Sequence, residues 1–194
     1  MDYITRKTTI LKYLKKNLSK KRLEHCLNVS KLAVELAKKH NADPLKAEIA
    51  GLLHDCTKNK SDREQILFFK KRSKIKEFDL IAKNNPQLLH SYSAAIVSKE
   101  EFNIKDKDIL NAVANHTLGN KNMSLLEKII YVADSASFER ECSNALSIRK
   151  LAKKNIERAF VEVMKNKIGY VLREEFWICP KCADVWNFYV KNKK

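Results

Sequence analysis

Four of the five histidines share a predicted helix face with aliphatic side chains, where they could bind a metal ion. These are His25, His54, His90 and His116. Taken singly, a buried histidine is often only a core residue hydrogen-bonded to a carbonyl group. Here, however, Asp55 directly follows His54, and Asp134 lies on a further apolar segment. Because an ionised carboxylate is costly to bury unless it is paired or binds a metal, the pattern predicts a metal site.

The donor types indicate what such a site would do. Mixed imidazole and carboxylate ligands suit iron, manganese or zinc, and six candidate ligands exceed the needs of one tetrahedral ion. Two neighbouring ions can share a carboxylate, activate water at neutral pH and neutralise a phosphoryl group. We therefore expect one or two ions, and the donor types leave iron, manganese and zinc open.

The helix that presents His54 and Asp55 is predicted to be the centre of the fold. Asp43 and Pro44 have the character of an N-cap and a first helical residue, and the following run is apolar on nearly every side. If the helix continues past His54, Lys58 lies on the same face as that histidine. A cation beside the His54 imidazole and the Asp55 carboxylate would suit a bound phosphate.

The other segments predict helices that could bring these groups together in a bundle core. Only 3 Gly and 3 Pro occur in 194 residues, too few for the turns of a many-stranded fold. Helical periodicity predicts helices at residues 6–18, 75–81 and 145–167, and in the segments after Ser19 and from His90. Capping residues predict further helices that are opened by Ser61, Asp106 and Ser124. The helix capped by Asp106 is predicted to end at Gly119 and Asn120. Trp177, Trp186 and Tyr189 are expected to pack the tail. We predict one all-α domain over residues 1–194.

Composition sets broader limits. The formal charge of +16 suits either a polyanionic partner or simply a lysine-rich surface, because the lysines are scattered. No apolar run is long enough for a membrane helix and no signal peptide is recognised, so we expect a cytoplasmic protein without membrane contact. Five cysteines without framework spacing indicate free thiols, including Cys179 and Cys182.

Several motifs together resemble one family. His25, the pair His54-Asp55 and Asp134 match the H...HD...D signature of the HD-domain phosphohydrolases. Further matches are His54-Asp55-Cys56-Thr57-Lys58, Pro86-Gln87-Leu88-Leu89-His90, His116-Thr117-Leu118-Gly119, Met123-Ser124, Tyr131-Val132-Ala133-Asp134 and Phe138-Glu139-Arg140. From about residue 22 to 187 the chain is similar to the YqeK family, bacterial symmetrical hydrolases of diadenosine tetraphosphate. Cys182 stands where that family has a hydroxyl residue, and residues 135–137 also depart from it.

The resemblance implies an HD-domain helical bundle with the metal site in its core, and a role for each matching residue. Metal ligands would be His25, His54, Asp55, His90, His116 and Asp134, with Asp55 bridging two ions. Asp55 and Lys58 would be catalytic, and the substrate would contact Lys58, Thr117, Gly119 and Arg140. Arg22 and Arg149 also match family arginines, although surface positions would explain both equally well. The implied reaction cuts diadenosine tetraphosphate into two ADP, and a homodimer is possible.

Two alternatives remain open from the sequence. The same ligands would serve another HD-type nucleotide phosphohydrolase or phosphodiesterase, because substrate choice depends on the surrounding pocket. A different class is a basic RNA- or ribosome-binding module with a structural metal. We expect no nucleic acid partner, because no RNA-binding motif occurs and aromatic residues do not alternate with the lysines.

Overall fold

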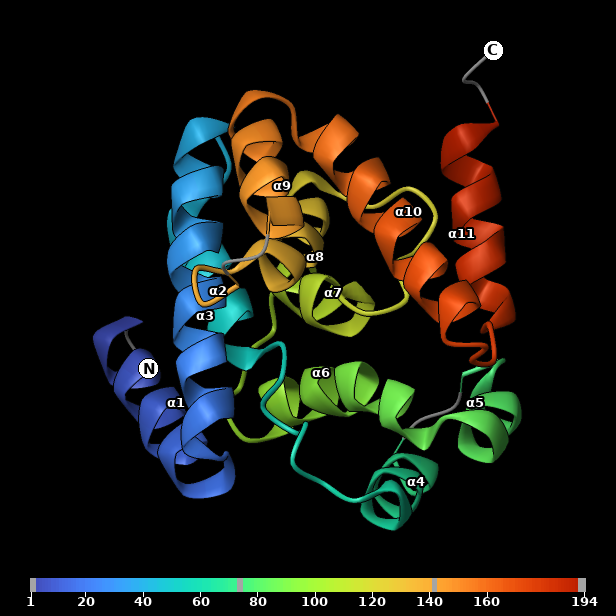
Figure 1. Cartoon of the computed structure of the whole chain (residues 1–194). Coiled ribbons are helices and arrows are strands. Elements are labelled where there is room, and N and C mark those ends of the chain that lie inside the picture. The colour runs from blue at the N-terminus through green and yellow to red at the C-terminus, as the bar shows by residue number, and fades with distance from the viewer. Residues whose placement is uncertain (1–2, 73–74, 141–142, 192–194) are drawn as a thin grey trace.

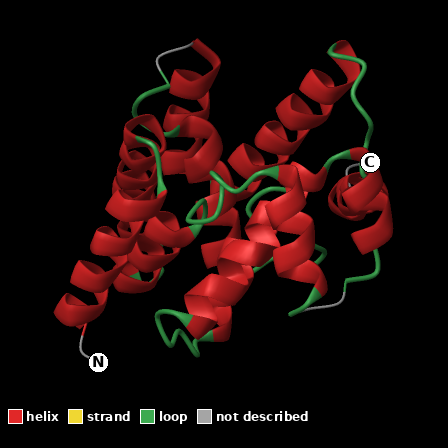
Figure 2. Cartoon of the chain, turned by 90° about the horizontal axis from the view of Figure 1, so that it is seen from below, coloured by secondary structure: helices red, strands yellow, loops and turns green. Residues whose placement is uncertain are grey.

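A computed structural model describes residues 3–72, 75–140 and 143–191, and within these ranges the chain forms helices and no strand (Figures 1 and 2). The elements are α1 (Tyr3–Asn17), α2 (Lys20–Lys39), α3 (Pro44–Leu53), α4 (Asp62–Lys70), α5 (Phe78–Asn84), the 3-10 helix η1 (Pro86–Leu89), α6 (His90–Glu100), α7 (Lys107–Asn115), α8 (Leu125–Ala136), α9 (Ser143–Lys154), α10 (Ile156–Arg173) and α11 (Pro180–Val190). This confirms the predicted all-α class. None of the described helices is at once long and apolar enough to cross a membrane.

The helix starts that were predicted from capping residues are confirmed, because each depends on local capping chemistry. Ser19 accepts a hydrogen bond from the backbone of α2, and Asp43 does the same for α3, with Pro44 as first residue. Ser61 and Ser124 each form a complete capping box. Asp106 caps α7 through its side chain.

The structure differs from the predicted elements at five places. α7 ends at Asn115, before the predicted end at Gly119 and Asn120. α3 ends at Leu53, and the next residues form turns, so Lys58 is not helical. α5 begins at Phe78 and therefore excludes Ile75, where the helix was predicted to start. The segment 145–167 lies in two helices, because Asn155 leaves the helical conformation and caps α10. α11, which runs along α10 at the edge of the molecule, was not predicted (Figure 1).

Close contact between α2 and α3 positions the central histidines. Gly51 of α3 faces Ser30 of α2, and a Cβ atom at Gly51 would lie only 2.6 Å from the Ser30 Cα atom. The Ser30 hydroxyl donates to the Glu48 carbonyl across the same contact at 3.0 Å. The absence of a side chain at Gly51 therefore lets the two backbones touch, which brings His25 of α2 near His54 at the end of α3.

The hydrophobic core has a large and a small part. The large part includes buried residues of α1, α2, α3, α6, α7, α8, α9, α10 and α11. The small part lies among α4, α5, η1, α6 and the start of α11 and contains Phe69, Ile81, Leu89, Leu118 and Cys179. Trp177 packs on the small part and Trp186 and Tyr189 on the large one, which confirms that these aromatic residues hold the tail.

Candidate metal centre

The turn after α3 presents His54 and Asp55 to the core and is tied to two other elements. Thr57 donates its hydroxyl hydrogen to the His90 carbonyl at 2.9 Å, which joins the turn to the start of α6. The buried Gln65 amide of α4 donates to the Thr57 carbonyl at 2.8 Å. His54 and Asp55 are thus held by buried hydrogen bonds, although they lie just beyond the helix.

Four histidines form two pairs around one aspartate. The Nε2 atoms of His25 and His54 lie 3.2 Å apart, and those of His90 and His116 lie 3.1 Å apart. Asp55 Oδ2 lies 3.8 and 3.6 Å from the first two Nε2 atoms. Its other oxygen, Oδ1, lies 3.1 and 3.6 Å from the second two. Each oxygen of one carboxylate therefore faces a different histidine pair.

Asp134 of α8 lies beside the pair formed by His25 and His54. Its Oδ1 atom lies 3.2 Å from His25 Nε2 and 3.9 Å from His54 Nε2. The structure thus brings all six candidate ligands together. His54 and His116 directly follow α3 and α7 and are not within them, while His25 and Asp134 lie within helices and His90 begins one.

The protein fixes the tautomer of each histidine through Nδ1. A carbonyl oxygen can only accept a hydrogen bond, so an Nδ1 atom bonded to a carbonyl must carry the proton. The carbonyls of Gly51, Gln87 and Val113, each three residues earlier in the chain, accept from His54, His90 and His116. His25 Nδ1 donates to the carboxylate of Glu139. All four Nε2 atoms therefore point lone pairs toward the cluster.

These residues fit metal ions. Two lone pairs at 3.1–3.2 Å repel each other unless a cation lies near both. Two nitrogen ligands bound to one ion at about 2.1 Å, with an angle of about 90–109° between them, lie roughly 3.0–3.4 Å apart. Both histidine pairs have this spacing, and the donor set of imidazole and carboxylate suits iron, manganese or zinc. The outer hydrogen bonds on Nδ1 are those that orient histidine ligands in metal sites.

Electrostatics favour the metal-binding forms of Asp55, Asp134 and His54. Burial opposes charge on Asp55, but the adjacent histidines, His54 first, hold the pKa of its carboxyl well below the usual range. Burial likewise opposes charge on Asp134, and Lys167 and His25 keep the pKa of that carboxyl low. Burial lowers the pKa of His54 to about 4, so its imidazole is neutral. Burial also lowers the pKa of His25, but the carboxylates of Asp134 and Glu139 outweigh this effect, so the pKa of His25 is raised overall.

Four basic side chains surround the cluster. Arg22 Nη1 lies 2.7 Å from Asp55 Oδ2, and Arg140 Nη2 lies 4.0 Å from Asp134 Oδ1. Lys58 Nζ lies 3.2 Å from His90 Nδ1, which gives its proton to a carbonyl. Lys58 therefore has no acceptor there, and its charge remains available to an anion. The fourth cation is Lys167 of α10, whose Nζ atom lies 3.5 Å from Asp134 Oδ2.

The other residues singled out from the sequence have different positions. Thr117 lies at the cluster, with its hydroxyl 3.2 and 3.0 Å from the Nε2 atoms of His90 and His116. Gly119 is not among the cavity residues; it adopts a left-handed φ of 74° in the turn after Thr117, beneath Val185 of α11.

Arg149 is a buried structural residue. Its guanidinium group donates to the carbonyls of Ser137 at 2.9 Å and Arg140 at 3.1 Å. Ser137 in turn donates to the Glu139 carboxylate at 2.6 Å. Arg149 therefore holds the loop that carries the Nδ1 partner of His25 and the Arg140 side chain. It is not the exposed charge that the sequence left as an alternative.

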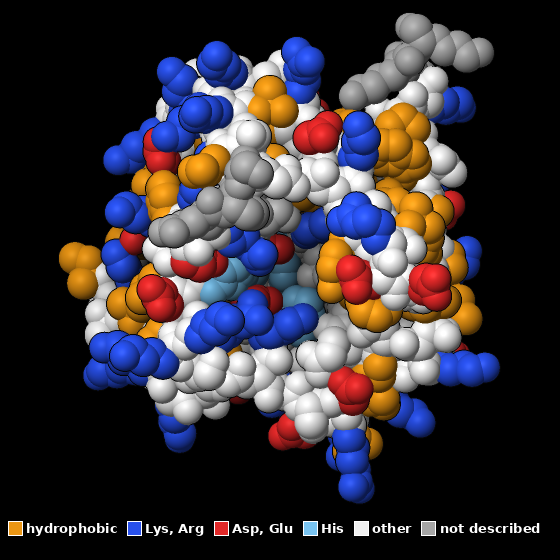
Figure 3. Space-filling model, viewed as in Figure 1, with side chains coloured by type: hydrophobic (Ala, Val, Ile, Leu, Met, Phe, Trp, Pro, Cys, Tyr) orange, Lys and Arg blue, Asp and Glu red, His pale blue; other side chains and the backbone are white. Residues whose placement is uncertain are grey.

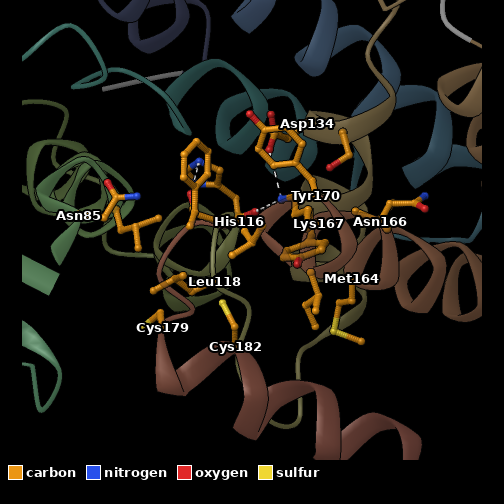
Figure 4. Close-up of a pocket in the computed structure, with 18 of the residues that line it drawn as sticks. Asn85, His116, Leu118, Asp134, Met164, Asn166, Lys167, Tyr170, Cys179 and Cys182 are labelled. Carbon is orange, nitrogen blue, oxygen red and sulfur yellow. Dashed lines mark hydrogen bonds and ion pairs between the residues drawn. The ribbon is translucent and has the colours of Figure 1, made fainter. Parts of the chain in front are cut away.

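A cavity of about 650 Å³ opens from the cluster (Figures 3 and 4). At one end lie His90, His116, Asp55, Asp134 and the four cations, and Figure 3 shows basic side chains around a hollow that exposes histidine. At the other end, Leu118, Met164 and Trp177 belong to an apolar wall between α10 and the start of α11. A ligand with an anionic part and an aromatic part suits this cavity.

Two free cysteines also line the apolar end, namely Cys179 and Cys182. Cys26 and Cys56 are free and buried, and Cys142 lies outside the described residues. The described part of the chain thus confirms the prediction of free thiols. Burial raises the pKa of Cys182 to about 11 and keeps it protonated.

Sequence reasoning gave no role to Lys167 or Glu139. Lys167 is one lysine among many on an amphipathic helix, and only the packing of α10 against α8 directs it inward. Glu139 stands in the Phe138-Glu139-Arg140 motif, which could have identified it, since its carboxylate follows Asp134 closely in the chain.

Comparisons with known proteins agree with this arrangement. The model of the HD domain family matches residues 22–139. The chain is 33% identical over 184 residues to "Bis(5'-nucleosyl)-tetraphosphatase, symmetrical" of Halalkalibacterium halodurans, covering 95% of this chain and 97% of that protein. It is 33% identical to the protein of the same name in Bacillus subtilis, with 91% and 94% covered. A crystal structure described as a predicted HD superfamily hydrolase involved in NAD metabolism, from Clostridium acetobutylicum, is similar with a TM-score of 0.89 at 34% identity, covering 100% of this chain and 99% of the other.

Proposed function

The chain belongs to the HD domain family, and from this premise we propose that it is a metal-dependent hydrolase that cuts diadenosine tetraphosphate symmetrically into two ADP. The resemblance derived from the sequence motifs is confirmed, because two relatives at 33% identity carry the name of a symmetrical bis(5'-nucleosyl)-tetraphosphatase.

One observation supports the reaction type above all. Asp55 presents its two oxygens to two separate histidine pairs, at the cationic end of a cavity large enough for a nucleotide. A carboxylate shared in this way suits two ions, with His25, His54 and Asp134 as further ligands of one and His90 and His116 as further ligands of the other. When bound, such ions supply an activated water and neutralise charge on the phosphoryl group. We infer iron, with manganese or zinc as alternatives.

The surrounding side chains have roles of their own. Arg22 and Lys58 bring positive charge to the polyphosphate from the α2 and α3 side, and Arg140 does so from the loop after α8. The Thr117 hydroxyl lies beside His90 and His116, where it can orient an oxygen of the substrate. These donors come from α2 and from the segments that follow α3, α7 and α8, so they reach the substrate from several sides of the cluster.

Hydrolysis adds one water across the central bridge of the tetraphosphate. The water oxygen bonds to one of the two inner phosphorus atoms, and the bond from that phosphorus to the bridging oxygen breaks. The bridging oxygen leaves with the other half, and the proton released by the water balances the two ADP products. Lys58 and Arg22 would stabilise the charge that develops on the phosphoryl oxygens.

The test is a product analysis with metal-loaded protein in ¹⁸O-labelled water. Diadenosine tetraphosphate should give ADP alone, with one label per substrate on a terminal phosphate. AMP together with ATP would show cleavage at an outer phosphorus and would refute the symmetrical reaction. A dinucleotide with two phosphates, such as NAD, belongs in the same panel because the Clostridium acetobutylicum relative is described as involved in NAD metabolism.

Two variants separate the metal site from the rest of the chain. Asp55→Ala should remove both bound metal and activity, because it deletes the carboxylate that both histidine pairs face. Lys165→Met, on the exposed face of α10, should retain both. Full activity in metal-free wild-type protein would contradict the proposal.

A further inference from the structure

Lys167 lies outside the part of the chain that the family model matches, yet its side chain reaches the metal centre from α10 (Figure 4). Its Nζ atom donates to the His116 carbonyl at 3.1 Å and lies 3.5 Å from Asp134 Oδ2. It also lies 3.9 Å from the centre of the Tyr131 ring. The ammonium group is therefore held at a defined point of the cavity wall.

These contacts do not fully satisfy the ammonium group. An ion pair between an ammonium and a carboxylate normally has a distance of about 2.7–2.9 Å, whereas the contact to Asp134 is 3.5 Å. The His116 carbonyl is neutral, and the ring contact is weaker than an ion pair. Because 30% of the Lys167 side chain is exposed and the residue lines the cavity, a further anion can reach it.

The charge balance of the cavity also indicates an anion. Three carboxylates lie at the cluster, and they are Asp55, Asp134 and Glu139. Four cations face them, and they are Arg22, Lys58, Arg140 and Lys167. One positive charge is thus in excess even before any divalent ion is counted. A polyanion would restore the balance.

The place of Lys167 indicates which part of the ligand it would contact. Lys58 follows Asp55 in the chain and touches His90 of α6, whereas Lys167 stands on α10 near Met164 and the apolar end of the cavity. If a nucleotide placed its base against the apolar wall and its phosphates at the cluster, the Lys167 ammonium group would lie beside the part of the nucleotide between these two ends.

We propose that Lys167 binds the phosphate that lies between the nucleoside in the cavity and the phosphate being cleaved. It would thereby favour substrates in which one phosphate separates the nucleoside from the cleaved phosphate. The proposal rests on the proposed function for the identity of the substrate, but its test measures binding alone. Lys167 touches the substrate directly and does not merely orient Asp134.

The experiment compares the binding of ADP and adenosine by titration calorimetry to metal-loaded wild type, Lys167→Met and Lys167→Arg. If Lys167 binds a phosphate, the ratio of the adenosine Kd to the ADP Kd should fall by about 10- to 100-fold in Lys167→Met, with adenosine binding unchanged. Lys167→Arg should recover part of the ratio. Lys165→Met, two residues away and exposed, should behave as wild type.

Two results would overturn the inference. An unchanged ratio in Lys167→Met would show that no phosphate contacts this residue. A loss of bound metal together with weaker binding of both ligands would show that Lys167 only positions Asp134. If wild type fails to cleave diadenosine tetraphosphate but the ratio falls as expected, the proposed function fails and the phosphate contact stands.

Discussion

Gly51→Ala tests whether helix packing sets the geometry of the metal centre. A Cβ atom at this position would lie 2.6 Å from the Ser30 Cα and 3.0 Å from the Ser30 nitrogen. Both obstacles are backbone atoms, so no side chain can rotate away. Restoring an ordinary contact of about 3.4 Å requires α2 and α3 to separate by about 0.8 Å, the difference from the 2.6 Å contact.

The expected cost has two parts. Overpacking of this kind lowers the free energy of unfolding by about 1–3 kcal/mol. The same displacement moves His25 away from His54, whose Nε2 atoms now lie 3.2 Å apart, whereas ligand positions must hold to within about 0.5 Å. We expect turnover of the folded variant to fall by about 10²-fold, the effect typical of a 1 Å misplacement.

The assay combines urea unfolding of the metal-free chain with metal analysis and turnover of the loaded chain below its unfolding temperature. Gly169→Ala is the matched control, because a Cβ atom there meets only the flexible end of Arg173 at 3.4 Å. In α10 that change should raise stability by about 0.5–1 kcal/mol and leave the metal in place. A Gly51→Ala chain with wild-type stability and metal content would refute the argument.

Three other predictions concern single side chains. Glu139→Ala removes the acceptor of the His25 Nδ1 proton and should weaken metal binding by about 10- to 100-fold, while Glu139→Gln, which keeps an acceptor, should lose less; metal titrations of both variants decide this. Lys58→Ala should keep its metal but slow turnover by about 10²- to 10³-fold, because Lys58 is a donor to the substrate and not a ligand; equal losses of metal and turnover would contradict that role. The pKa of His54 falls from 6.5 to about 4 on folding, so between these pH values the unfolded chain binds the extra proton and stability falls as the pH falls. The metal-free chain should thus lose about 3 kcal/mol from this group, and His54→Asn should flatten the pH dependence measured by urea unfolding.

The helix starts predicted from capping residues were correct because their causes are local. A serine at the N-cap and a glutamate three residues later satisfy backbone donors whatever the rest of the chain does, and this held at Ser61 and Ser124. Helix ends were less predictable. The end of α3 at Leu53 depends on how Thr57 and Gln65 tie the following turn to other helices, which no local pattern records.

The candidate ligands could be proposed from the sequence because imidazole and carboxylate groups on apolar faces are costly without a partner. The division of these groups into two sets could not be predicted, since only the packed structure shows that Asp55 turns Oδ2 to His25 and His54 and Oδ1 to His90 and His116. Lys167 resembles an ordinary surface lysine in the sequence. Its direction depends on the angle at which α10 crosses α8, a tertiary property.

The reaction type and the choice of substrate therefore depend on different parts of the chain. Every candidate ligand, and Glu139 that orients His25, lies within residues 22–139, where hydrogen bonds to Nδ1 direct each histidine inward. The cavity wall opposite the cluster comes from α10 and the residues around the start of α11, including Met164 and Trp177, and α10 also carries Lys167 beside the cluster. Changes in this wall can alter which nucleotide is held without moving a ligand atom. The metal-ligand motif alone consequently predicts hydrolysis at a phosphate, and the fuller set of motifs adds diadenosine tetraphosphate by resemblance, whereas a physical account of that selection has to be argued from the packing of the last two helices.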